Sequence, residues 1–202
     1  MASHPQAADS ASRTSANTAE RTLDVAERLV ALRGFNGFSY ADIADEVGVT
    51  KASLHYHFRG KAELGKALIA RYSARFAEAL ESIDRDVTGA RAKLDAYVSI
   101  YSGVLKGGRM CLCGMLAAEY ETLPTTMGEA VVRFLQYNEE WLTDVLTEGQ
   151  ADGSLSAVVT PADASQMILS GLEGAMLIAR TYGGLARFQG SAGRLLDALT
   201  LA

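Results

Sequence analysis

The chain has 202 residues, of which 49% are hydrophobic and 21% are charged. That composition supplies a core for one or two domains. It contains no window near the roughly 18 uninterrupted apolar residues of a membrane span. Residues 1–17 are rich in Ala, Ser and Thr and lack the apolar block of a secretory signal, so we predict a disordered arm there and a cytoplasmic protein without membrane contact.

The formal net charge of −5 is unevenly distributed. Residues 13–75 contain ten Lys and Arg against seven Asp and Glu, whereas the rest of the chain contains nine against seventeen. A mildly basic N-terminal third joined to an acidic remainder indicates that one part contacts phosphate and the other does not.

The first predicted helix follows the arm. Residues 18–33 place apolar side chains on one helical face, and Gly34 ends the helix. A second, short helix is predicted over 40–47. Ser39 is its N-cap and Asp42 stands three residues later, a capping-box arrangement with Asp in place of the usual Glu.

A third helix is predicted directly after a tight turn. Gly48 ends the preceding helix because glycine adopts the left-handed conformation that other residues avoid. Thr50 then caps a helix that reaches about His57. Gly60 breaks the chain, and a longer helix is predicted over 61–82.

The remainder of the chain has the period of longer amphipathic helices. Their predicted ranges are 94–105, 110–122, 127–145, 162–182 and 185–199. Asp152-Gly153 is a turn signal, and Pro161 suits the first turn of a helix. No alternating strand pattern and no repeat is present, so the predicted fold class is all-α with about nine helices.

Residues 40–58 have the pattern of a helix-turn-helix. Ala44 is small where the second helix crosses the first, and Gly48 suits the turn. The inner faces are apolar: Ile43, Val47, Val49, Leu54 and Phe58. The outer face of the second helix carries groups able to reach base edges and phosphates: Thr50, Lys51, Ser53 and His55. The alternative is a short helical hairpin with a purely structural role.

The flanking residues favour DNA binding. Lys61 follows Gly60 at a helix start, where backbone amides and an ammonium together attract phosphate. Tyr56 and His57 are aromatic side chains with polar tips, placed for backbone contacts.

The run from Phe38 to Leu64 resembles the DNA-binding signature of the TetR family of transcriptional regulators, and the resemblance extends over 18–72. It implies a recognition helix that presents Thr50, Lys51, Ala52, Ser53 and His55. It implies phosphate contacts through Tyr56, His57 and Lys61. Ser39 and Tyr40 complete the set of predicted DNA-binding residues. His55 stands where the family more often has tyrosine, and Ala52 where it often has glycine.

The resemblance also implies a division of labour: a DNA-binding domain over 18–60 and an effector-binding and dimerisation domain over 61–202. We expect a homodimer whose recognition helices enter successive major grooves of a near-palindromic operator, about 34–36 Å apart. A small-molecule effector would release this repressor from double-stranded DNA. No cofactor is implied.

The last two predicted helices are candidates for the dimer interface. Small residues there permit close backbone approach, and larger ones supply apolar area; the alternative is packing within one chain. The candidates are Gly171, Gly174, Ala175, Leu185, Phe188, Leu195, Leu196 and Leu199.

An effector pocket is expected among the earlier helices of the second domain. Asn138 interrupts an apolar stripe, and a buried amide needs hydrogen-bond partners, either a ligand or a neighbouring helix or water. Aromatic and Met side chains there could line a pocket or simply fill the core. The candidates are Tyr101, Met110, Cys111, Cys113, Met115, Tyr137, Asn138, Trp141 and Met176.

The two cysteines, Cys111 and Cys113, have three interpretations. They could be buried small hydrophobes at a helix start. They could instead form a redox or electrophile sensor, because a helix N-terminus and the nearby Arg109 lower a thiol pKa. Metal binding is the weakest reading, since the histidines all lie in the N-terminal part and zinc needs four ligands.

An enzyme is not expected. His55 and His57 are two apart on a helix and diverge, and no phosphate-binding loop or nucleophile elbow is present. The alternatives to a DNA-binding repressor are a thiol-based sensor acting through Cys111 and Cys113, a helical ligand-binding protein without specific DNA recognition, and an interaction module.

Overall fold

A computed structural model of the protein describes the backbone of residues 6–200 and the side chains from residue 17 onward. The fold is all-α, as expected. Within the described residues it has nine α-helices and one short 3₁₀ helix. They are α1 (Gln6–Arg33), α2 (Tyr40–Val47), α3 (Lys51–His57), α4 (Lys61–Asp86), α5 (Ala90–Lys106), α6 (Leu112–Ala118), η1 (Tyr120–Thr122), α7 (Thr125–Ala151), α8 (Pro161–Thr181) and α9 (Leu185–Thr200).

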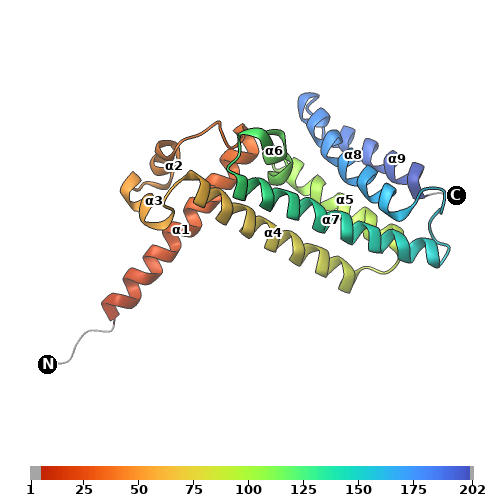
Figure 1. Ribbon diagram of the computed structural model, residues 1–202, viewed down its shortest axis with the longest axis horizontal. Helices are drawn as coiled ribbons and strands as arrows, with labels where there is room; N and C mark the ends of the chain where they lie inside the picture. Colours follow the sequence, from red (N-terminus) through yellow and green to blue (C-terminus); the bar gives the residue numbers. More distant parts are fainter. Residues whose placement is uncertain (1–5, 201–202) are drawn as a thin grey trace.

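The molecule is elongated, with α2 and α3 at one end and the C-terminus at the other (Figure 1). The long helices α4 and α7 run side by side along it, and α8 and α9 form a pair on the far side of α7 from α4. The N-terminal half of α1 projects away from the other helices. No helix among residues 6–200 is both long and apolar enough to cross a membrane.

The buried side chains form one continuous core that runs from the helix-turn-helix into the larger part. α4 packs against α1 at one end and against α5 and α7 along its length. Because α4 belongs to both parts, a movement in the larger part reaches the helix-turn-helix through a packed helix and not through a loose linker.

Two predicted boundaries differ from the structure. α1 begins at Gln6, so residues 6–17 are helical where the sequence predicted a disordered arm; this stretch contains four alanines, the best helix former. Residues 1–5 lie outside the described part. The helix predicted over 110–122 is divided into α6 and η1, and the Glu119 side chain at the break is bonded to the loop between α1 and α2.

Candidate DNA interface and effector cavity

Local hydrogen bonds shape the α2–α3 motif as predicted. Ser39 and Asp42 form the capping box, with the Ser39 N–H donating to the Asp42 carboxylate at 2.7 Å. These bonds from Ser39 lower the pKa of Asp42. Gly48 ends α2 in the left-handed region at φ 74°. Thr50 caps α3 by accepting from the Ser53 N–H at 3.2 Å.

The α2–α3 motif packs against α1. Ile43 and Leu54 are fully buried at the crossing of α2 and α3. Arg21 on α1 donates to the Val47 carbonyl at 2.6 Å, at the end of α2, and Arg28 on α1 pairs with Glu46 on α2. α3 therefore has one face on the core and the other turned outward.

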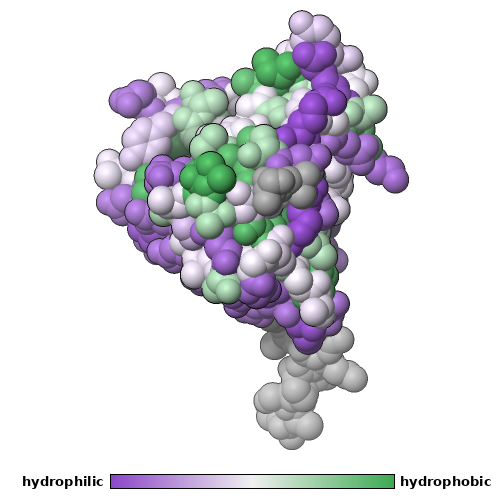
Figure 2. Space-filling view, turned by 90° about the vertical axis from the view of Figure 1, so that its right-hand side faces the viewer, coloured by the Kyte–Doolittle hydropathy of each residue, from purple (hydrophilic) through white to green (hydrophobic). Residues whose placement is uncertain are grey.

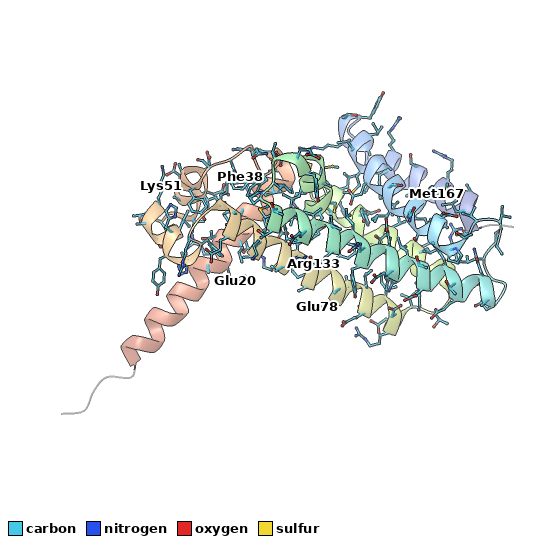
Figure 3. The ribbon with its side chains drawn as sticks, in the orientation of Figure 1. Glu20, Phe38, Lys51, Glu78, Arg133 and Met167 are labelled. Atoms are coloured by element: carbon cyan, nitrogen blue, oxygen red, sulfur yellow. The ribbon has the colours of Figure 1, made fainter. Side chains whose placement is uncertain are left out.

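The outward face of α3 collects most of the residues predicted to contact DNA. Lys51 lies at the outer edge of the motif (Figure 3). Thr50, Ala52, His55 and Tyr56 are also exposed, and 82% of Tyr56 is accessible. Ser53 and His57 are half-buried. The exposed set comes from one turn and one short helix, which is the arrangement that a major groove accommodates.

Lys61 and Tyr40 are predicted DNA contacts whose polar atoms are bound to carbonyls of the protein. Lys61 directs its ammonium inward to the Phe35 and Phe38 carbonyls, 4.2 Å from the centre of the Phe38 ring. Desolvation lowers the pKa of Lys61. These loop carbonyls lack helical partners and attract the ammonium, so a phosphate contact would require Lys61 to exchange them for a phosphate oxygen.

Tyr40 has a similar internal role. Its hydroxyl donates to the Phe58 carbonyl at 3.0 Å, and its ring lies 4.8 Å from that of His55. Burial, with a smaller effect of Glu63, raises the pKa of Tyr40 to about 12. Tyr40 thus joins the start of α2 to the end of α3, a role that the sequence did not indicate.

The end of α1 is tied to the segment after α6. Glu119 accepts hydrogen bonds from the Phe35 N–H at 2.5 Å and the Asn36 N–H at 3.2 Å. The Asn36 side chain donates to Thr122 at 2.8 Å. A shift of α6 would therefore pull directly on the loop between α1 and α2.

Ion pairs make a second connection between α1 and the larger part. Arg71 on α4 lies 2.8 Å from Asp24 and 3.0 Å from Glu27, both on α1. Arg75 also pairs with Glu27, and Arg109 reaches the same carboxylate at 4.0 Å. Glu27 and Arg71 are shielded from solvent, so this pairing is screened less than a surface pair.

Asn138 is satisfied by the protein itself. Its amide oxygen accepts from the Tyr97 hydroxyl at 2.9 Å, and its amide nitrogen donates to the Phe134 carbonyl at 2.8 Å. Tyr97 also lies 3.2 Å from the Tyr101 hydroxyl. Burial raises the pKa of both tyrosines. Of the partners expected for Asn138, the neighbouring helix is the one found, through Tyr97 of α5.

The cysteines are buried among acidic and phenolic groups. Burial is the main reason that the pKa of both Cys111 and Cys113 is raised, and the nearby Glu173 carboxylate acts in the same direction. The Cys111 sulfur also accepts from the Tyr72 hydroxyl at 3.6 Å. The expected lowering of a thiol pKa at the start of α6 is wrong, because desolvation and a negative neighbour outweigh the helix end.

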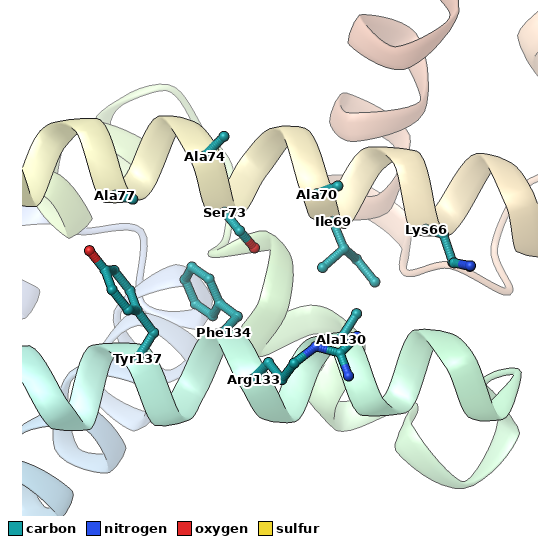
Figure 4. A pocket seen from close by; sticks show the side chains of 10 residues that line it. All are labelled: Lys66, Ile69, Ala70, Ser73, Ala74, Ala77, Ala130, Arg133, Phe134 and Tyr137. Carbon is teal, nitrogen blue, oxygen red and sulfur yellow. The ribbon is translucent and has the colours of Figure 1, made fainter.

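Two hollows lie on either side of α7. The first is a groove of about 470 Å³ between α4 and α7. Phe134 and Tyr137 extend from α7 toward small residues of α4, and Lys66 and Arg133 border the groove (Figure 4). The second, about 370 Å³, lies between α6, α7 and α8. It is lined by Met110, Gly114, Met115, Ala117, Ala118, Leu135, Glu139, Leu169, Ser170, Glu173, Gly174 and Leu177.

The predicted pocket residues are divided by the structure. Met110 and Met115 line the second hollow, hereafter the α6–α8 cavity. Tyr137 lines the groove between α4 and α7. The others are buried in the core and line neither hollow: Tyr101, Cys111, Cys113, Asn138, Trp141 and Met176.

Glu173 is the cavity residue that the sequence analysis missed. The sequence could have indicated it, since Glu173 is the one charged residue between Asp163 and Arg180, in a run of apolar and small residues. Burial raises the pKa of its carboxyl, although the nearby Cys111 and Tyr101 act in the opposite direction.

The predicted dimer residues also separate into two groups. Phe188, Leu196 and Leu199 are buried within the chain. Gly171 accommodates Leu195 of α9, since a Cβ at 171 would lie 2.5 Å from that side chain. These residues join α8 to α9, which is the alternative of packing within one chain. Ala175 and Leu185 are half-buried, whereas Gly174 is exposed.

α8 has an exposed apolar face beside these contacts. Met167, Leu177 and Ile178 are 47%, 54% and 47% accessible, and Figure 3 places Met167 on α8. Seen from the end that carries the C-terminus, hydrophobic side chains appear among hydrophilic ones toward the top, the level of α8 and α9 (Figure 2).

An exposed recognition face on a helix-turn-helix, joined through packed helices to a larger part with a cavity, defines a DNA-binding regulator with its own ligand domain. Residues 23–68 match the family model of bacterial regulatory proteins of the tetR family. Residues 90–191 match the tetracyclin repressor-like C-terminal domain. The chain belongs to the TetR family of transcriptional regulators, a non-enzymatic family.

Known proteins resemble the chain over most of its length. It is 30% identical over 155 residues to the transcriptional regulator AcuR of Cereibacter sphaeroides, covering 73% of this chain and 69% of AcuR. It is 22% identical over 147 residues to the repressor DhaR of a Mycobacterium species, covering 72% and 73%. A TetR-family regulator from Agrobacterium tumefaciens has the same fold, with a TM-score of 0.89, 30% identity and coverage of 92% and 99%.

Proposed function

We propose that this regulator is a homodimeric repressor that a small molecule in the α6–α8 cavity releases from a near-palindromic operator. Membership of the TetR family supports operator DNA and a ligand domain as the two partners of the chain. The position of α6 between the cavity and the DNA-binding motif supports the link between them.

That position of α6 is the observation that carries the proposal. Gly114 and Met115 of α6 line the cavity, while Glu119, directly after α6, accepts from the Phe35 and Asn36 N–H groups at the end of α1. A ligand that displaces α6 therefore acts on the loop that precedes α2. Such a coupling is typically worth about 1–3 kcal/mol, enough to disfavour the separation of recognition helices that the operator requires.

The exposed face of α8 supports a homodimer. Met167 and Ile178 leave large apolar surfaces in solvent, and neither lines the α6–α8 cavity. Apolar surface of this kind, rimmed by polar residues, is typical of an interface. A second copy meeting it about a two-fold axis would present two α3 helices to DNA.

The test is fluorescence anisotropy of the full-length protein with duplexes that tile the DNA upstream of its own gene, at two salt concentrations. We expect tight binding to one near-palindromic duplex. Lys51→Ala should weaken it by roughly ten- to hundredfold, the value of one base or phosphate contact. Lys106→Ala, which removes an exposed lysine at the end of α5, is the matched control and should bind as the wild type does.

Equal, weak and salt-sensitive binding to every duplex would contradict the proposal. It would favour the alternative of a helical ligand-binding protein without specific recognition. The thiol-sensor alternative has less support, because the raised pKa of Cys111 and Cys113 leaves both thiols protonated and poorly nucleophilic.

A further inference from the structure

The α6–α8 cavity has one polar atom that the protein leaves without a partner. The Glu173 side chain lines the cavity, and its Oε1 is fully buried with no hydrogen-bond partner among the described residues. A buried carboxylate oxygen without a partner is costly, and native proteins rarely retain one without a functional reason. The buried Cys111 and Tyr101 side chains hydrogen-bond to this carboxyl, and the partner that a ligand can add is a further hydrogen-bond donor.

The structure makes room for this carboxylate on α6. A Cβ at Gly114 would lie 2.2 Å from Glu173 Oε2, so a side chain at 114 would displace the carboxylate. Glycine in the first turn of a seven-residue helix has a cost in conformational entropy. Gly114 therefore leaves the space that the carboxylate of Glu173, a residue of the cavity wall, occupies.

The remaining lining favours a positively charged ligand with an apolar body. Glu139 is a second carboxylate of the wall, and none of the twelve lining residues is Lys, Arg or His. Ten of the twelve are neither acidic nor basic, and most of these are Ala, Leu, Met or Gly. The groove between α4 and α7 has the opposite charge, since Lys66 and Arg133 border it.

We infer that the α6–α8 cavity takes a small organic cation, an ammonium on an apolar skeleton, whose N–H groups donate to Glu173. This inference rests on the proposed function in taking the cavity as the effector site. The cavity volume of about 370 Å³ lies at the small end of ligand pockets, so one compact molecule fills it. Charge-assisted hydrogen bonds to the carboxylate give such a ligand its selectivity.

Three probes with one carbon skeleton test the inference: 3-phenylpropylammonium, 3-phenylpropanol and 3-phenylpropanoate. They differ only in a cationic, neutral or anionic terminal group. Binding to the full-length protein is measured by isothermal titration calorimetry without DNA. We expect the ammonium to bind roughly ten- to hundredfold more tightly than the alcohol, and the carboxylate to bind most weakly because it faces Glu173 and Glu139.

Glu173→Gln is the matching variant, because it keeps the shape and removes the charge. It should lower the affinity for the ammonium by roughly ten- to hundredfold and leave the alcohol nearly unchanged. Glu140→Gln is the control, since it removes one exposed carboxylate of α7 that does not line the cavity. Gly114→Ala, which displaces the carboxylate without changing any charge, should also weaken the ammonium selectively.

The inference is overturned if the ammonium shows no advantage over the alcohol, shows no saturable binding, or binds folded Glu173→Gln as it binds the wild type. The three-probe comparison on the wild type decides this even if a variant fails to fold. Operator release is measured separately by anisotropy. Glu173-dependent binding without release would contradict the proposed function alone, whereas release by a different ligand class that does not need Glu173 would contradict the inference alone.

Discussion

The recognition face of α3 and the cavity wall at Glu173 both present polar side chains, but under opposite conditions. Lys51 and Tyr56 are exposed, so water satisfies them until DNA arrives. Glu173 Oε1 is buried and lacks a partner among the described residues, and water cannot compensate it. The comparison teaches that binding and stability are separable on α3, whereas at the cavity one carboxylate influences both.

The largest expected effect tests the first half of that comparison. Leu54 is fully buried directly beneath the recognition face, so Leu54→Ala should lower the free energy of unfolding by about 2–5 kcal/mol. Lys51→Ala on the outer face should change it by less than about 0.5 kcal/mol. Urea denaturation followed by circular dichroism measures both. A comparable loss in Lys51→Ala would show that the outer face also supports the fold.

The second-largest effect on stability is expected at Lys61, which lies beside the recognition face but directs its ammonium inward. Lys61→Ala removes a charged donor from the Phe35 and Phe38 carbonyls, and we expect a loss of about 1.5–3 kcal/mol in stability. The slope of log affinity against log salt for DNA should stay the same. A slope reduced by about one would identify Lys61 as a phosphate contact after all.

Glu173 should link stability to pH. Its pKa is raised in the folded protein, so its contribution to stability is fully present below the ordinary range of a Glu carboxyl and declines as pH rises toward the folded value. Wild type should therefore lose stability relative to Glu173→Gln as the pH rises from the ordinary range of a Glu carboxyl, about 4.3, toward neutrality and above. Thermal unfolding of the ligand-free proteins over that range measures the difference, and a flat difference would mean that burial does not perturb this carboxyl.

The smallest effect is expected at the thiols. Because burial raises the pKa of Cys111 and Cys113, both should be nearly unreactive toward Ellman's reagent at pH 8 in the native protein and fully reactive after unfolding. Replacing both with Ser should leave operator affinity intact. If an oxidant or electrophile releases the wild type from DNA but not this double variant, the thiol-sensor alternative is correct.

The helix-turn-helix could be predicted residue by residue because its determinants are local. The Ser39–Asp42 box, the left-handed Gly48 and the Thr50 cap each act within a few residues of the chain. Local propensity and capping therefore determined the bounds of α2 and α3 in advance. The periodicity of the later segments likewise determined that the fold is all-α, because a long amphipathic stripe has one favoured conformation.

The direction in which a polar side chain points was decided only by the tertiary structure. Asn138 bonds Tyr97, 41 residues away, and Lys61 turns toward carbonyls 23 and 26 residues away. Gly114 and Glu173 border one cavity from different helices. Sequence alone determined the all-α class, the short capped helices α2 and α3, and the resemblance of their motif to a DNA-binding one. Only the packing of distant helices decided which buried polar groups have hydrogen-bond partners and which lack one, because that depends on partners that periodicity does not encode.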